Sequence, residues 1–228
     1  MFSRCVLIIR WSPALSPSAP PHDASDSGST AARQSARLWV VVGAGVGYGF
    51  GMNEELRQWA ESVARTHLQR LPKRWKHVQG VAGQAETAAD LVDDPDMLVA
   101  AAWLHDVGYA PDLVNTGFHP VDGASFLRSI GAAERLCALV ANHSCAHVEA
   151  RRRDISLEWA DERTPLRDAL WWADMTTTAT GERTDLQSRV ADIERRYGSE
   201  HVVTQSIREA EPELADAVRR TESLLVLR

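Results

Sequence analysis

The sequence predicts an all-α protein. After residue 52, apolar residues recur three and four positions apart, which is the spacing of helices that bury one face. No stretch alternates apolar and polar residues in the manner of a strand, and no internal repeat is present. Prolines and glycines interrupt the periodic stretches at short intervals, so we expect a set of separate helices rather than one long helix.

Residues 1–51 differ from the rest of the chain. Their central part is rich in Ser, Ala and Pro and is expected to be disordered. The glycines near their end do not form a dinucleotide-binding fingerprint, because the last glycine position of that motif holds Tyr48, Phe50 or Met52 in every register. The same stretch is too short and too rich in glycine for a confident membrane helix. We interpret residues 1–51 as a disordered or mis-assigned extension, and residues 52–228 as the folded domain.

The composition limits the classes of function. The 228 residues carry a net charge of −6, so the chain lacks the basic footprint of a nucleic-acid-binding protein. A hydrophobic content of 44% and a charged content of 25% are ordinary for a soluble globular domain. The three cysteines, Cys5, Cys137 and Cys145, form no CxxC pair and no disulfide framework. We therefore expect a cytoplasmic protein in a reducing compartment.

The first half of the folded domain predicts three helices. An amphipathic helix of about 18 residues starts at Met52 and ends before Pro72, and a second helix follows over residues 73–92. Residues 97–104 form a third helix that is apolar on every side, with Gly108 as a stop signal after it. Because a helix that is apolar all round is buried, we expect the third helix to lie inside the domain.

The second half predicts further helices around one charged segment. Residues 145–164 are polar and charged, and we expect them to form a loop or an irregular segment. Pro165 then provides a helix start, and Pro212 predicts a break or a kink in the last helical region. The expected helices cover residues 119–130, 132–144, 165–181, 183–197, 200–210 and 212–227, the last two being one helix if the chain only kinks.

The dipeptide His105-Asp106 stands at the end of the predicted buried helix. Burying an imidazole and a carboxylate is costly unless a partner pairs with them. A divalent metal is such a partner, because both groups are ligands for transition metals. The alternative is a helix-end aspartate bonded to a neighbouring histidine, and the dipeptide alone leaves both interpretations open.

Other residues that can bind metals fall on the apolar faces or at the ends of the remaining helices. A single inward histidine is more often a hydrogen-bonded core residue than a ligand. Four histidines and two aspartates in one small helical domain are hard to satisfy with one another alone, so metal coordination is the simplest explanation. The inward candidates are His77, His105, Asp106, His119, His143 and Asp174.

These residues and the segments around them resemble the HD-domain superfamily of metal-dependent phosphohydrolases. His77, the pair His105-Asp106 and Asp174 match the H…HD…D signature, and the segments AAWLHDVGY and WWADMTT match as well. The resemblance covers about residues 53–180. It implies an irregular helical bundle of the HD-domain type, in which these four residues are the core metal ligands.

The segments FHPVDGASFL and LVANHS add two histidines to the resemblance. His119 and His143 match the additional histidines of superfamily members that hold two metals, with Asp106 as the bridging ligand. The resemblance therefore implies one or two divalent transition metals per chain, drawn from Mn, Fe, Ni, Co or Zn.

The resemblance further implies hydrolysis of a small phosphorylated metabolite or nucleotide. A metal lowers the pKa of bound water and makes hydroxide available as the nucleophile, so Asp106 counts as catalytic. Arg151 is our preferred phosphate-binding residue, because its basic run follows a ligand helix, and His147 is the candidate leaving-group acid one turn after His143. The other basic candidates are Lys73, Arg74, Lys76, Arg152 and Arg153. A solvated surface is the common alternative for such runs, as it is for His147.

Two other classes of function share the same ligand set. The six residues also resemble those of the diiron oxygenases in the superfamily, in which iron activates oxygen. A regulatory or binding domain that keeps its metal is the third alternative. Coloured protein that consumes oxygen would favour the oxygenase, whereas colourless protein that hydrolyses phosphoesters with Mn, Co or Ni would favour the hydrolase.

Overall fold

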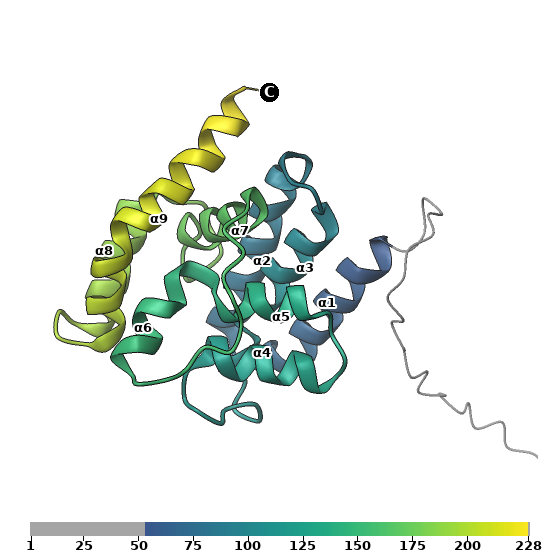
Figure 1. Cartoon of the computed structure of the whole chain (residues 1–228). Helices are drawn as coiled ribbons and strands as arrows, with labels where there is room; N and C mark the ends of the chain where they lie inside the picture. Colours follow the sequence, from purple (N-terminus) through teal and green to yellow (C-terminus); the bar gives the residue numbers. More distant parts are fainter. Residues whose placement is uncertain (1–52, 228) are drawn as a thin grey trace, which may run out of the picture. The chain divides into compact units, whose positions relative to one another are not determined.

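The computed structural model describes residues 53–227, whose regular elements are all helices (Figure 1). The α-helices are α1 (Asn53–Leu68), α2 (Pro72–Ala88), α3 (Pro95–Leu104), α4 (His119–Ser129), α5 (Glu134–Ala141), α6 (Ala146–Arg152), α7 (Pro165–Met175), α8 (Leu186–Tyr197) and α9 (Val202–Val226). Three 3₁₀ turns accompany them: η1 (Ala89–Leu91), η2 (Val107–Tyr109) and η3 (His143–Cys145). The described residues contain no strand, so the predicted fold class is confirmed. The predictions for residues 1–51 lie outside the described residues.

Helix α3 is buried on all sides, as the sequence predicts. Asp94 caps its first turn by accepting a hydrogen bond from the backbone N–H of Met97 at 3.1 Å, and Pro95 occupies the first turn, where no N–H is needed. The helix packs against α1, α2, α5 and α7. Because α3 ends at Leu104, the pair His105-Asp106 begins where this buried helix stops.

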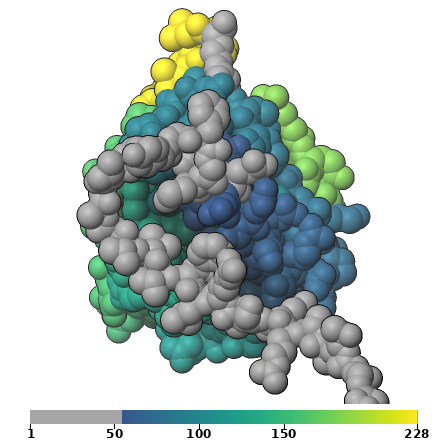
Figure 2. Space-filling view, turned by 90° about the vertical axis from the view of Figure 1, so that its right-hand side faces the viewer, coloured from purple at the N-terminus to yellow at the C-terminus, as the bar shows by residue number. Residues whose placement is uncertain are grey.

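Helices α1 and α2 cover one side of α3. The side of α1 that faces the core carries Ala60, Ala64 and Leu68, and its other side is on the molecular surface, visible as dark-blue spheres in Figure 2. Pro72 begins α2, and α2 places His77 in the interior with 1% of its surface exposed. The two helices therefore bring the first histidine of the predicted set to the end of α3.

Two glycines allow close backbone approaches beside the candidate ligands. A Cβ atom on Gly108 would lie 2.1 Å from the carbonyl oxygen of His119, so only glycine lets η2 lie directly against α4. Gly181 has a φ of +90°, and a Cβ atom there would lie 2.4 Å from the carbonyl oxygen of Lys76. These contacts fix α4 against the end of α3, and the loop after α7 against α2.

The predicted loop over residues 145–164 is partly wrong, because it contains the short helix α6. Ser144 and Cys145 both have positive φ values, 47° and 59°, and this turn separates α5 from α6. Val148 and Ala150 are buried, and α6 packs against α9. A helix of only seven residues with three buried apolar side chains, two of them alanines, leaves too weak a periodicity in the sequence to be recognised.

The C-terminal helices α8 and α9 pack against each other, and α9 also packs against α6 and α7. In Figure 1 they lie together at one side of the bundle, α9 in yellow. Helix α9 runs through Pro212 as one element, so the alternative of a single helix holds. A second apolar cluster joins these helices to α7, with Trp171 and Leu214 fully buried in it. No helix among the described residues is both long and apolar enough to cross a bilayer.

Candidate metal centre

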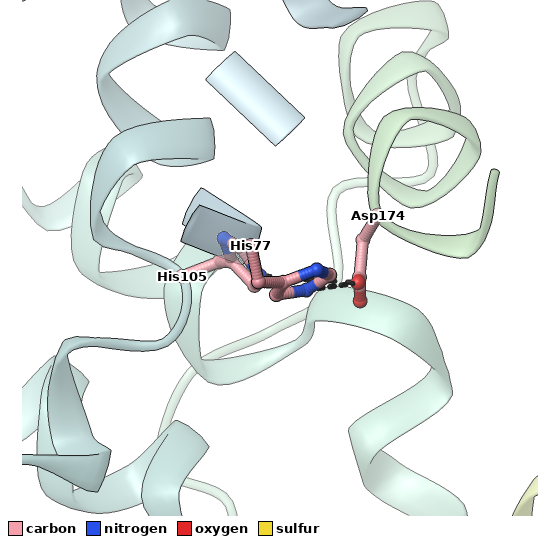
Figure 3. A group of neighbouring side chains, drawn as sticks. All are labelled: His77, His105 and Asp174. Carbon is pink, nitrogen blue, oxygen red and sulfur yellow. Dashed lines mark hydrogen bonds and ion pairs between the residues drawn. The ribbon is translucent and has the colours of Figure 1, made fainter. Parts of the chain in front are cut away.

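The structure brings all six predicted ligand residues together. Asp106 follows α3 directly, His119 is the first residue of α4, and Asp174 lies in the last turn of α7. Their ligating atoms form two neighbouring groups, each with all atoms within 4.8 Å of one another: His77, His105 and Asp174 in the first, and Asp106, His119 and His143 in the second. Figure 3 shows the imidazoles of His77 and His105 facing the carboxylate of Asp174.

Main-chain carbonyl groups orient three of the four histidines. A carbonyl oxygen only accepts hydrogen bonds, so the ring nitrogen that faces it carries the proton, and the other nitrogen presents its lone pair. This is the common support for a metal-binding histidine. The Nδ1 atoms donate to carbonyl oxygens in each case: His77 to Thr178 at 2.9 Å, His105 to Ala102 at 2.8 Å and His143 to Val140 at 2.6 Å.

Among the inward nitrogen atoms, that of His105 has no hydrogen-bond partner within residues 53–227. His105 is 0% exposed, and its Nε2 accepts no hydrogen bond from any described residue. His77 Nε2 lies 3.0 Å from Asp174 Oδ1, and His119 Nε2 lies 3.3 Å from Asp106 Oδ1. At His77, a lone pair and a carboxylate oxygen that face each other at this distance repel unless a proton or a metal ion lies between them. His119, whose Nδ1 faces no carbonyl oxygen among these contacts, can instead donate from Nε2 to Asp106 or to His143 Nε2, which lies 3.1 Å away. Imidazole nitrogen and carboxylate oxygen are the donor set of divalent transition metals, so the residues fit such an ion.

Burial and neighbouring charges favour the ionisation states that metals need at three of the four histidines and at Asp106. At His105 burial lowers the pKa, but the negative charge of Asp106 outweighs it and raises the pKa above its usual value. Burial lowers the pKa of His77 and of His119, and burial together with His119 and His105 lowers the pKa of His143 to about 3. Burial alone would raise the pKa of Asp106, but the positive charge of Arg74 and the neighbouring His105 hold it well below its usual value. Neutral imidazoles and an ionised carboxylate are the ligand forms that bind metals.

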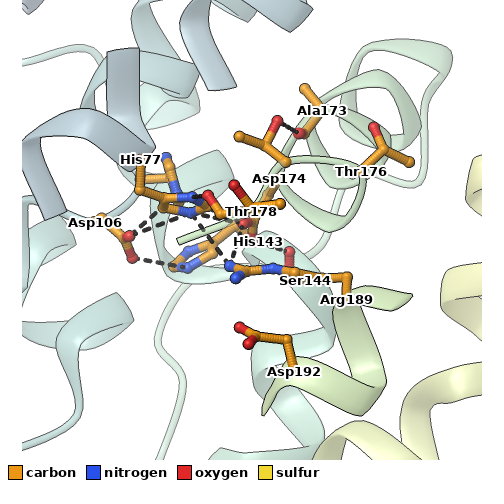
Figure 4. A network of polar contacts seen from close by, with 12 residues as sticks. His77, Asp106, His143, Ser144, Ala173, Asp174, Thr176, Thr178, Arg189 and Asp192 are labelled. Carbon is orange, nitrogen blue, oxygen red and sulfur yellow. Dashed lines mark hydrogen bonds and ion pairs between the residues drawn. The ribbon is translucent and has the colours of Figure 1, made fainter. Parts of the chain in front are cut away.

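Ser144, rather than the threonines after α7, orients the carboxylate of Asp174. Ser144 Oγ donates a hydrogen bond to Asp174 Oδ2 at 2.5 Å, so Oδ1 is left to face His77 (Figure 4). The threonines that follow Asp174 do not bond to its carboxylate: Thr177 Oγ1 donates to the carbonyl of Ala173 at 2.7 Å. The positive φ of Ser144 places its hydroxyl at the carboxylate, a geometry that the sequence does not reveal.

A cavity with a volume of about 90 Å³ adjoins the cluster. Arg74 lines it, forms an ion pair with Asp106, and lies 3.7 Å above the ring of Tyr109. Tyr109 in turn stacks on His119 with ring centroids 3.9 Å apart. Arg74 is thus the member of the two basic runs that lies at the cavity.

Helix α8 supplies a further arginine, Arg189, to the cavity wall. It is not among the candidate residues predicted from the sequence. Arg189 Nη2 lies 3.5 Å from Asp174 Oδ1 and 3.4 Å from His77 Nε2. Arg189 stands four residues before Ile193, which is buried, so the helical period places both on one face. The four-residue spacing between Arg189 and Ile193 is the feature of the sequence that could indicate a buried arginine. An arginine in a charged helix is usually solvated, however, so the spacing alone does not single it out.

His147 and Arg151 lie on α6 and do not line the cavity. His147 Nε2 is 3.8 Å from Glu213 Oε2, and Arg151, with 61% of its side chain exposed, forms an ion pair with Glu209. Both face α9 rather than the cluster. Their roles as leaving-group acid and phosphate-binding residue stay predictions.

The comparison with protein families gives one match. The HD domain family matches residues 74–177, a segment that contains all six clustered residues and ends before α8. Among curated proteins and solved structures, none matches the chain. The helical fold, the buried histidine and aspartate cluster and this match agree. Residues 74–177 are therefore an HD domain, of the metal-dependent phosphohydrolase superfamily.

Proposed function

We propose that the protein is a metal-dependent phosphohydrolase that acts on a small phosphoester or nucleotide. The observation that carries the proposal is the orientation of the imidazoles, whose lone pairs point at two buried carboxylates inside an HD domain. A cluster of this kind is expensive to bury without a cation. The chain also keeps all six candidate ligand residues, which argues against a domain that has lost its metal and serves only as a scaffold.

The ligands divide naturally between two metals. His77, His105 and Asp174 would hold one ion together with Asp106, and His119 and His143 would hold a second, with Asp106 shared. A bound divalent ion lowers the pKa of a coordinated water and offsets charge on phosphoryl oxygens.

Arg74 and Asp106 prepare the cavity for an anionic group. Arg74 keeps Asp106 ionised and holds its carboxylate in place, while the guanidinium remains at the cavity wall. Hydrolysis breaks the bond between phosphorus and the alcohol oxygen, joins the oxygen of water to phosphorus, and passes one proton to the alcohol. A guanidinium at the wall would stabilise the charge on the phosphoryl oxygens during that exchange.

The first prediction concerns activity and metal content. Protein purified without added metal should contain a transition metal, measured by elemental analysis, and should hydrolyse members of a phosphoester panel in the presence of Mn, Co or Ni. A chelator should abolish the activity, because the proposed mechanism depends on the metal to activate water. Fully metallated protein that cleaves no phosphoester would contradict the proposal, and oxygen uptake by coloured protein would support the oxygenase alternative.

The second prediction concerns the number of metals. His119→Ala should lower the metal content from about two to about one per chain, because the second group loses one of its three ligands. His67→Ala is the matched control: His67 pairs with the exposed Asp112 at 3.1 Å, away from the cluster, and its loss should leave the metal content unchanged. An unchanged content of about two metals in both variants would exclude His119 as a ligand.

A further inference from the structure

Arg189 is a buried cation with unused hydrogen-bond donors. The residue is 6% exposed, and no described residue accepts a hydrogen bond from its Nε or Nη1 atoms, both of which are fully buried. Its side chain reaches from α8 to His77 and Asp174, at the inner end of the cavity (Figure 4). The guanidinium therefore lies at the cavity wall and has two donors that no described residue satisfies.

The charge of Arg189 is poorly balanced within the described chain. A buried guanidinium is costly unless an anion pairs with it closely, and the 3.5 Å to Asp174 is a long contact. The same carboxylate already accepts the hydroxyl of Ser144 at 2.5 Å and faces His77 at 3.0 Å. The other carboxylate of the cluster, Asp106, pairs with Arg74. An anion in the cavity would balance the charge of the guanidinium at its wall.

The shape of the cavity limits what that anion can be. Its inner end is formed by buried residues, among them Arg189 and Asp174, and its volume of about 90 Å³ is far below the roughly 300–1,000 Å³ of sites for larger ligands. The half-buried side chains of Tyr197, Val203 and Ile207 also line it and form its outer part. The small, buried inner end favours a phosphoryl group that is the end of its molecule over a diester, which needs room for a second substituent.

We infer that Arg189 binds the terminal phosphoryl group of a phosphomonoester, whose alcohol portion lies against α8 and α9. This inference rests on the proposed function and narrows its substrate class. A terminal phosphoryl group carries up to two negative charges and three free oxygens, which suit the unused donors of a guanidinium. Arg189 lies outside the matched HD domain segment, so helices beyond that domain select the substrate.

Inorganic phosphate is the probe for this role, because it is the phosphoryl product of monoester hydrolysis. Calorimetry on the metal-saturated protein should show phosphate binding on the order of 10- to 100-fold weaker in Arg189→Gln, with Arg189→Lys between the two because it keeps the charge. Arg195→Gln is the matched control: Arg195 lies on the same helix, is 74% exposed and pairs with Asp192, so phosphate affinity should not change. Metal content should be equal in all four proteins.

Kinetics with one leaving group in two esters tests the substrate class. Wild-type protein should prefer nitrophenyl phosphate over bis(nitrophenyl) phosphate by at least about tenfold, and Arg189→Gln should raise the KM of the monoester. Unchanged phosphate affinity in Arg189→Gln and Arg189→Lys, or a preference for the diester, would overturn the inference while leaving hydrolysis intact. Conversely, phosphate affinity that depends on Arg189 in a protein without hydrolytic activity would refute only the proposed function.

Discussion

Asp106→Ala should remove bound metal and hydrolytic activity together. Asp106 is the only member of the cluster whose carboxylate lies near histidines of both groups, 3.6 Å from His77 Nε2 and 3.3 Å from His119 Nε2, among the described residues. Its loss also leaves Arg74 as an unpaired positive charge at the cavity wall, which repels a metal. Activity should fall by more than about 100-fold, which is the largest loss typical of replacing a residue that only supports a metal ligand.

Elemental analysis and a phosphoester assay on the same preparation check this result. Asp112→Ala is the control, because Asp112 is exposed and pairs with His67 outside the cluster. Asp106→Asn keeps the volume of the side chain and should still lose metal, which separates a loss of ligation from a loss of packing. Normal metal content in either Asp106 variant would disprove its assignment as a ligand.

Trp171→Ala should cause the largest loss of stability. The residue is 0% exposed, lies in the cluster that joins α7 to α8 and α9, and carries the guanidinium of Arg167 3.5 Å above its ring. Removing a buried aromatic side chain leaves a cavity and costs about 3–5 kcal/mol of unfolding free energy. For a domain of this size, Tm should fall by roughly 6–20 °C.

Urea and thermal unfolding measure this loss. Trp171→Phe should lose less than Trp171→Ala, because the aromatic ring remains, and Leu227→Ala, at a residue that is 83% exposed, should stay within about 0.5 kcal/mol of the wild type. A loss below about 1 kcal/mol for Trp171→Ala would mean that α7 and α9 are not packed through this side chain. Because α8 belongs to the same cluster, Trp171→Ala should also weaken phosphate binding through Arg189.

The sequence was sufficient to predict the helices that place the histidines. The uniform apolarity of α3 and the periodicity of α2 put His105 and His77 inside before any contact was known, and the structure brings both to Asp174. These are local properties of a helix, and a sequence records them directly.

Features that depend on contacts between distant segments were not predictable in the same way. The burial of Arg189 results from how α8 packs on α7 and α9, and its neighbours along the chain are ordinary charged residues. The hydroxyl of Ser144 reaches Asp174 only because of a left-handed backbone turn. The arginine of the basic runs that lines the cavity is Arg74, whereas Arg151 pairs with Glu209, since nearness to a ligand along the chain does not fix the direction of a side chain.

The carbonyl oxygens that receive the three Nδ1 protons belong to Thr178, Ala102 and Val140. Every amino acid has such an oxygen, so substitutions at these three positions can keep the hydrogen bonds to the imidazoles. An alignment of relatives would therefore show variable residues at positions on which the geometry of the centre depends. Counting only conserved residues would underestimate how many positions of the chain hold the ligands in place.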